Sequence, residues 1–180
     1  AERGAAAARQ RASVAAASTG AVALFHVVGV TPEAATLDAA THGQVPGRTV
    51  ALTAEMLRGS LARLSTAGQG GRVDAVAVGS PHFSIGEFEH LVRLMSGRRL
   101  AVPFYACTAR GTLLALEEQG DAEVLREAGV EIIVDTCVVV TPILPASGGV
   151  LMTNSGKFAH YGPSNTGYEV LYGSLEDCVD

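Results

Sequence analysis

Two cysteines lie where apolar runs of the sequence end. Cys107 follows the run 100–105, and Cys137 follows the run 131–134. If both runs are strands of one sheet, the two thiols can lie close together although they are far apart in the chain. A pair of thiolates at a sheet edge suits an iron–sulfur cluster or zinc. The alternative is that both are buried as small apolar side chains, because no CxxC spacing supports ligation.

The surroundings of the cysteines refine this hypothesis. A helix predicted over 108–119 begins directly after Cys107, and the N–H groups at a helix N-terminus favour a thiolate. Cys178 stands beside Glu176 and Asp177, and we expect it to be structural. Three cysteines do not form a disulfide framework, and an odd number in so apolar a chain favours a reducing compartment. The sequence therefore predicts a cytoplasmic protein.

A polar turn follows the apolar run 150–152. Its residues are Asn154, Ser155, Gly156 and Lys157. Backbone N–H groups, a hydroxyl and an ammonium can converge there on a carboxylate or a phosphate. A Walker motif is excluded because its upstream glycine and its spacing are missing. Lys157 is the single lysine among 13 lysines and arginines, which indicates either chance or a need for a compact ammonium.

Two further segments carry polar groups that a substrate could use. Arg110 could clamp a substrate carboxylate through two N–H groups. The segment 79–84 combines a glycine, which permits close backbone approach, with Ser80 and His82 at the opening of a helix. The alternative is that Ser84 only caps this helix and that His82 is only a surface turn residue.

These side chains need a scaffold that brings them to one edge. Nearly continuous apolar strands alternate with helical patterns, which predicts an α/β fold with a mostly parallel sheet and helices on both faces. The predicted strands are 21–28, 48–52, 74–78, 100–105, 131–134, 150–152 and 168–172. The predicted helices begin at Thr31, span 53–66, follow the capping pair Ser84 and Glu87, span 108–119 and 121–128, and begin at Ser174. Ligands collect at the carboxyl ends of parallel strands, so the reactive segments are predicted to share one edge.

Composition limits the classes of function. The chain has 180 residues, of which 48% are hydrophobic and 17% charged, so a globular fold is expected. A net charge of -5 without a basic stripe argues against nucleic acid as a partner. The absence of a long uninterrupted apolar run argues against a membrane span. Residues 1–20 are predicted to be an alanine-rich helical segment, superficially similar to a transit peptide, and residues 21–180 a single α/β domain.

Five segments together carry a family resemblance. Their residues are Gly-Ser-Pro-His-Phe-Ser at 79–84, Cys-Thr-Ala-Arg at 107–110, Asp-Thr-Cys at 135–137, Met-Thr-Asn-Ser-Gly-Lys at 152–157 and Tyr-Gly-Ser-Leu-Glu-Asp-Cys at 172–178. In this order they resemble the C-terminal half of the aconitase X large subunit or domain, over about residues 20–180. The resemblance implies an aconitase-like domain of an enzyme that removes water from a hydroxy acid with an iron–sulfur cluster. Bacterial members are similar to cis-3-hydroxy-L-proline dehydratases, and archaeal members to mevalonate 5-phosphate dehydratases.

The resemblance also implies roles for single residues. Cys137 is the first expected cluster ligand and Cys107 the second, whereas a third ligand would come from the rest of the large chain. The family has a small swivelling domain or subunit that carries the catalytic serine, and nothing in this sequence matches it. We therefore expect a fragment that is inactive alone. Substrate binding is expected from Ser80, His82, Arg110, Asn154, Ser155 and Lys157.

Two alternatives remain open. A low lysine content is atypical of hyperthermophilic proteins, which favours the bacterial substrate over mevalonate 5-phosphate. A hypothesis of another class is a non-catalytic α/β module that binds an anion or serves in assembly.

Overall fold

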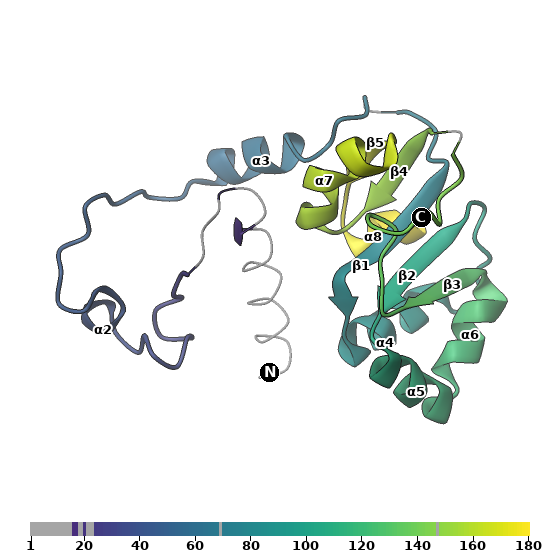
Figure 1. Ribbon diagram of the computed structural model, residues 1–180, viewed down its shortest axis with the longest axis horizontal. Coiled ribbons are helices and arrows are strands. Elements are labelled where there is room, and N and C mark those ends of the chain that lie inside the picture. Colours follow the sequence, from purple (N-terminus) through teal and green to yellow (C-terminus); the bar gives the residue numbers. More distant parts are fainter. Residues whose placement is uncertain (1–15, 18–19, 21–23, 69, 147) are drawn as a thin grey trace.

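The computed structural model describes residues 16–17, 20, 24–68, 70–146 and 148–180. Its centre is a parallel sheet of five strands in the order β3-β2-β1-β4-β5 (Figure 1). The strands are β1 Ala75–Phe83, β2 Phe104–Thr108, β3 Val130–Val134, β4 Val150–Thr153 and β5 Glu169–Tyr172. The predicted α/β fold with a parallel sheet is confirmed.

Helices cover both faces of this sheet, as predicted. Side chains alternate along β1, so that Val76 and Val78 face one layer while Ala75 and Ala77 face the other. The first layer contains α4 Ile85–Met95, α5 Arg110–Gln119, α6 Asp121–Ala128 and α8 Leu175–Val179. The second layer contains α7 Gly156–Thr166 and apolar residues of the segment 137–144.

The strand order places a reversal of winding between β1 and β4. From β1 the chain moves outward through β2 to β3, and it then returns to the other side of β1 for β4 and β5. At such a reversal the connections leave neighbouring strands in opposite directions, which opens a crevice outside their carboxyl ends. This topology directs attention to the residues that follow β1 and β4.

Local capping explains why the helices of this unit begin and end where they do. The Glu87 carboxylate accepts the backbone N–H of Ser84 at 2.9 Å at the start of α4, as predicted. Gly120 and Gly129 end α5 and α6 in the left-handed conformation.

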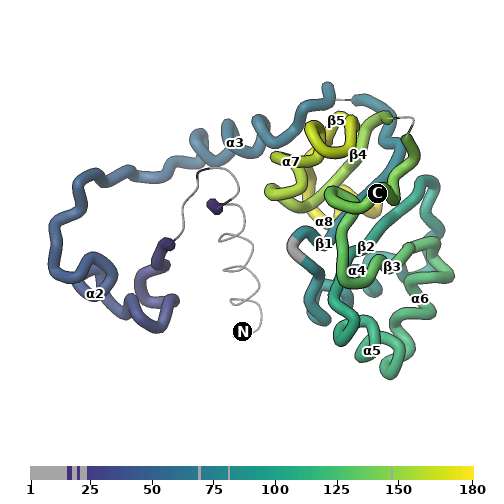
Figure 2. The backbone as a smooth tube through the Cα atoms, viewed as in Figure 1, coloured from purple at the N-terminus to yellow at the C-terminus, as the bar shows by residue number. Residues whose placement is uncertain are grey.

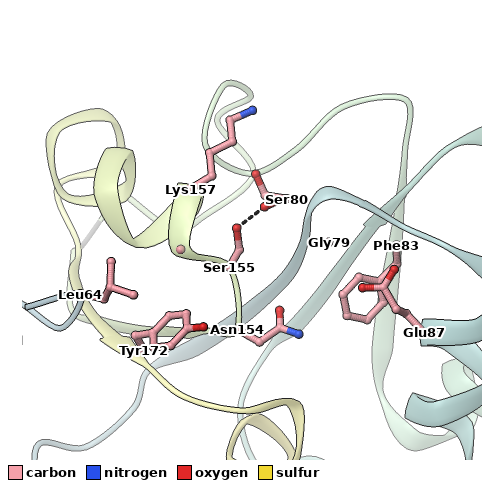
Figure 3. A pocket seen from close by; sticks show the side chains of 10 residues that line it. Leu64, Gly79, Ser80, Phe83, Glu87, Asn154, Ser155, Lys157 and Tyr172 are labelled. Atoms are coloured by element: carbon pink, nitrogen blue, oxygen red, sulfur yellow. Dashed lines mark hydrogen bonds between the residues drawn. The ribbon is translucent and has the colours of Figure 1, made fainter. Parts of the chain in front are cut away.

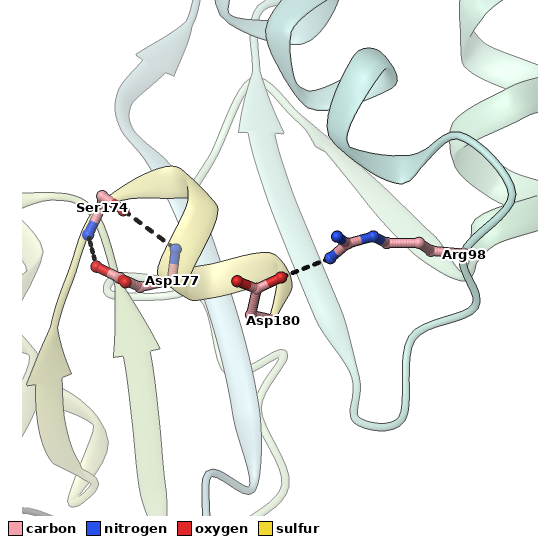
Figure 4. A network of polar contacts seen from close by, with 4 residues as sticks. All are labelled: Arg98, Ser174, Asp177 and Asp180. Carbon is pink, nitrogen blue, oxygen red and sulfur yellow. Dashed lines mark hydrogen bonds and ion pairs between the residues drawn. The ribbon is translucent and has the colours of Figure 1, made fainter.

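Helix α8 is fixed at both of its ends (Figure 4). Ser174 and Asp177 exchange backbone-to-side-chain hydrogen bonds of 2.8 and 3.1 Å at its start. The backbone N–H of Ser174 holds the pKa of the Asp177 carboxyl below its usual value. At the other end Arg98 forms an ion pair of 2.6 Å with Asp180.

The two strands and the first helix predicted before residue 53 are wrong where the structure describes them. Neither 24–28 nor 48–52 is a strand, and a turn stands where a helix was expected at Thr31. This part contains the short helix α2 Leu37–Thr41, which was not predicted, and the helix α3 Ala54–Ala62, which lies within the predicted helix 53–66 and has Thr53 as its cap. The predicted helix 1–20 and the start of the strand 21–28 lie outside the described residues, except for residues 16, 17 and 20.

Residues 24–28 and 48–52 form no strands because no other strand lies beside them among the described residues. Residues 24–62 extend away from the sheet (Figure 2), and the side chains of Leu24 and Val45 are 75% and 92% exposed. An apolar run becomes a strand only where another strand can accept its hydrogen bonds. Further on, Thr66 joins the sheet edge, because its N–H donates to the Val170 carbonyl at 2.8 Å and its hydroxyl accepts from the Val170 N–H at 2.8 Å.

Two differences concern the site itself. The strand predicted over 100–105 begins only at Phe104, after Pro103, which cannot donate to a strand ladder. Helix α7 was not predicted, because Gly156, Gly162 and Pro163 interrupt its helical pattern.

Among the described residues no helix is long and apolar enough to cross a membrane.

Candidate functional site at the carboxyl ends of β1 and β4

A cleft of about 260 Å³ opens where the topology indicated, beyond the ends of β1 and β4 (Figure 3). It is lined by Leu64, Gly79, Ser80, Phe83, Glu87, Asn154, Ser155, Gly156, Lys157 and Tyr172. Four of the eight predicted site residues therefore come together here: Ser80, Asn154, Ser155 and Lys157.

One wall of the cleft is a bulge in β1. Val78 pairs with Ala106 and Phe83 pairs with Thr108, so β1 contains three more residues than β2 between these pairs. Gly79 opens the bulge with φ +84°, and a Cβ atom there would lie 2.1 Å from the carbonyl oxygen of Cys107. Only glycine allows so close an approach together with this backbone angle. The bulge takes Ser80 out of the pairing with β2 and places it against the cleft.

Ser155 ties this bulge to α7. Its hydroxyl accepts the N–H of Phe158 at 3.1 Å as the helix cap, and it donates its proton to the carbonyl of Ser80 (Figure 3). The side chain is buried. Because its only proton is already donated, Ser155 cannot donate to a bound anion while this hydrogen bond persists. Its contribution in this structure is to hold the two walls of the cleft together.

The start of α7 offers donors for an anion. Lys157 is half-buried and forms no ion pair with any described residue. The first two helical N–H groups, of Gly156 and Lys157, have no acceptor among the described residues. The positive end of the helix dipole adds to this potential. Together these groups can bind a carboxylate or a phosphate.

The opposite wall contains residues that the sequence analysis did not select as site residues. In Figure 3 the Asn154 amide points across the cleft toward Phe83 and Glu87, and Tyr172 lies beside Asn154. Tyr172 ends a predicted strand, so the strand-end rule could have selected it. Glu87 was interpreted only as a capping residue, a role that it has. A second hollow continues from these side chains to His90, which lies 3.1 Å from the carboxylate of Glu176.

The two predicted cluster ligands lie on the other side of the bulge. Cys107 is inside β2 and 1% exposed, whereas Cys137 is half-buried in the loop after β3 and packs against the same apolar cluster. The prediction that a helix N-terminus favours a Cys107 thiolate is wrong. Helix α5 begins only at Arg110, and burial raises the pKa of the Cys107 thiol to about 11. Cys178 is buried in the first layer, and burial raises its pKa to about 12, as expected for a structural thiol.

These thiols fit an iron–sulfur cluster only in part. Cys137 has access to solvent, and both thiols belong to the same apolar cluster. No group of three potential metal ligands exists among the described residues. The described residues would therefore supply these two ligands, with Cys137 the more accessible, and further ligands would come from other parts of the protein.

His82 and Arg110 do not line the cleft. His82 donates from Nε2 to the carbonyl of Thr136 at 3.2 Å. Arg110 forms an ion pair of 2.9 Å with Asp135, and its backbone N–H also donates to this carboxylate. The backbone hydrogen bond is the main cause that lowers the pKa of the Asp135 carboxyl. Both predicted substrate-binding side chains thus contact the loop that contains Cys137.

Comparison with known proteins agrees with this architecture. The chain is 39% identical over 163 residues to a cis-3-hydroxy-L-proline dehydratase of Pseudomonas aeruginosa, covering 88% of this chain and 28% of the relative. It is 31% identical to the phosphomevalonate dehydratase large subunit of Methanosarcina mazei, over 91% of this chain and 38% of the relative. A crystal structure of Thermococcus kodakaraensis aconitase X in its holo-form superposes with a TM-score of 0.80 at 26% identity, over 95% of this chain and 42% of that one.

The chain thus spans between about a quarter and two fifths of the length of these proteins. Family descriptions match in two parts: residues 7–62 match the aconitase X second domain, and residues 73–180 match the aconitase X third domain. The boundary expected between residues 20 and 21 stays a prediction. Because the third-domain match alone covers more than half of the sequence and includes the whole sheet, the chain belongs to the aconitase X family.

Proposed function

We propose that this chain is part of an iron–sulfur-dependent hydro-lyase that removes water from a hydroxy acid, with cis-3-hydroxy-L-proline as its substrate. The observation that carries the proposal is the cleft at the reversal of winding, which is lined by Lys157 and the start of α7, with Cys137 on the far side of the same β1 bulge. The substrate is inferred from the relatives, since identity is 39% to the cis-3-hydroxy-L-proline dehydratase and 31% to the phosphomevalonate enzyme.

Each residue of the cleft has a defined task in this proposal. Elimination of water beside a carboxylate needs a cationic anchor, a base for the α-proton and an acceptor for the leaving hydroxyl. Lys157 and the free N–H groups at the start of α7 hold the carboxylate, and Ser80 and Asn154 orient the ring. A cluster bound through Cys137, with Cys107 second, would supply a Lewis acid for the hydroxyl. We assign the base to the small swivelling domain that the family resemblance implies.

The extended segment before the sheet supports the need for further protein. Residues 24–62 expose many apolar side chains, among them Leu52, Leu57 and Leu61 at 74%, 54% and 50%. Apolar surface of this extent favours a partner. We propose that the remainder of the large chain covers this surface, and that the 180-residue chain alone has no activity. The cytoplasmic location stays a prediction.

The complete protein tests the proposed function directly. After anaerobic reconstitution with iron and sulfide, we expect bound iron, visible charge-transfer absorption and turnover of cis-3-hydroxy-L-proline. Protein without iron or absorption would refute the cluster. Turnover of mevalonate 5-phosphate instead would favour the alternative substrate, and iron-free protein that binds carboxylates without turnover would favour a non-catalytic module.

The anion anchor makes a separate prediction. In the complete protein, Lys157→Met should lower kcat/KM about 10- to 100-fold, because a hydrogen bond to a charged group contributes about 1.5–3 kcal/mol. Lys157→Arg keeps the charge but changes its shape, so a smaller loss is expected. Steady-state kinetics with cis-3-hydroxy-L-proline measure both. An unchanged kcat/KM in Lys157→Met would remove Lys157 from the site.

A further inference from the structure

The loop that contains Cys137 begins with an unusual backbone conformation. Asp135 has φ +59°, and besides His42 it is the one described non-glycine residue with a positive φ. This left-handed conformation costs an ordinary residue about 1–2 kcal/mol, and aspartate tolerates it better than most. The turn it makes sends the chain from the end of β3 toward Thr136 and Cys137. Such a conformation persists only where surrounding contacts hold it.

Arg110, the first residue of α5 after β2, supplies those contacts. Its backbone N–H donates to Asp135 Oδ1 at 2.9 Å, and its Nε and Nη2 donate to Oδ2 at 3.0 and 2.9 Å. Helix α5 has Ala109 at its cap position, which has no side chain able to accept a hydrogen bond. The Asp135 carboxylate therefore caps α5 from another segment, as a local capping residue otherwise would.

Two further contacts hold the residue between Asp135 and Cys137. His82 from the β1 bulge donates to the carbonyl of Thr136 at 3.2 Å, and the hydroxyls of Thr136 and Thr141 lie 2.5 Å apart. The carbonyl of Cys137 itself accepts the N–H groups of residues 140 and 141, each at 3.1 Å. The backbone on both sides of the thiol is thus fixed by β1, by α5 and by its own turn.

We propose that Asp135 and Arg110 form a positioning pair that aims the Cys137 thiol at the cluster. In this role Arg110 acts through Asp135, to which its Nε and Nη2 are bound, and not through a direct contact with substrate. The inference rests on the proposed function, since it needs Cys137 to be a ligand. Residues that contact a metal ligand, but not the metal itself, orient that ligand. Their loss lowers metal affinity or activity about 10- to 100-fold.

The test measures how firmly the complete, reconstituted protein retains iron. Asp135→Ala and Arg110→Gln should lose visible absorption to a chelator about 10- to 100-fold faster than the unchanged protein. Asp135→Asn keeps an acceptor and tolerates the left-handed conformation, so it should restore part of the retention. The matched control is Arg126→Gln, which breaks another exposed ion pair of 2.9 Å, with Glu117, on the far parts of α5 and α6.

The outcomes separate this inference from the proposed function. The positioning pair is supported if Asp135→Ala and Arg110→Gln lose iron faster and have an altered absorption spectrum. In the same experiment Arg126→Gln should keep a Tm and an iron retention close to those of the unchanged protein. Equal retention in Asp135→Ala and in the unchanged protein overturns the pair and leaves the proposed function intact. Equally fast loss in Arg126→Gln also overturns it, because the effect is then general. An unchanged protein that binds no iron overturns both.

Discussion

Cys137→Ser in the complete protein is expected to abolish cluster binding and turnover together. A thiolate is a soft ligand that suits iron–sulfur clusters, whereas a serine hydroxyl stays protonated near neutral pH and binds such iron poorly. Cys137 is the more accessible of the two thiols on this side of the bulge. Iron content, visible absorption and the rate of cis-3-hydroxy-L-proline turnover measure the loss.

The other cysteines provide controls for this substitution. Cys178→Ser alters a thiol that is 4% exposed in the opposite layer, so it should keep iron and turnover even if it lowers the Tm. Cys107→Ser tests the second ligand, because Cys107 belongs to the same apolar cluster as Cys137. Unchanged iron content and turnover in Cys137→Ser would make Cys137 structural and would refute the cluster assignment.

Gly79→Ala is expected to lower the free energy of unfolding by about 2–5 kcal/mol, as the sum of a left-handed alanine and an overpacked contact. The added Cβ would lie 2.1 Å from the Cys107 carbonyl oxygen and 2.9 Å from its nitrogen. These are backbone atoms of the adjacent strand, which cannot rotate away as a side chain could. Denaturant unfolding measures the change.

Gly86→Ala is the matched control. Gly86 lies in α4, and a Cβ there would have no heavy atom within 4 Å. Alanine is the better helix former by about 0.5–1 kcal/mol, so this variant should be more stable than the unchanged protein. Opposite signs for the two variants are expected. A Gly79→Ala protein with unchanged stability would mean that the bulge in β1 can move aside, and the cleft wall would then be adjustable.

The sequence by itself determined most of the architecture from residue 74 onward. Apolar runs that alternate with capped helices are local patterns, and capping pairs such as Ser84 with Glu87 act within one turn of helix. The same local patterns misled before residue 54, where Leu24 and Leu52 of the two predicted strands are exposed and the described residues form no strand. They also missed α7, because Pro163 and two glycines hide a helix that packs on the sheet through Phe158.

Only the tertiary structure decided how the reactive residues divide between two places. The strand-end rule selected the right edge of the sheet, and Lys157, Asn154 and Ser80 do share one cleft there. The sequence could not show that the three extra residues of β1 form a wall, with the cleft on one side and Cys137 on the other. Nor could it show that Arg110 is bound to Asp135. Register, bulges and ion pairs join residues that are distant in the chain, and no local pattern of residue types encodes such partners.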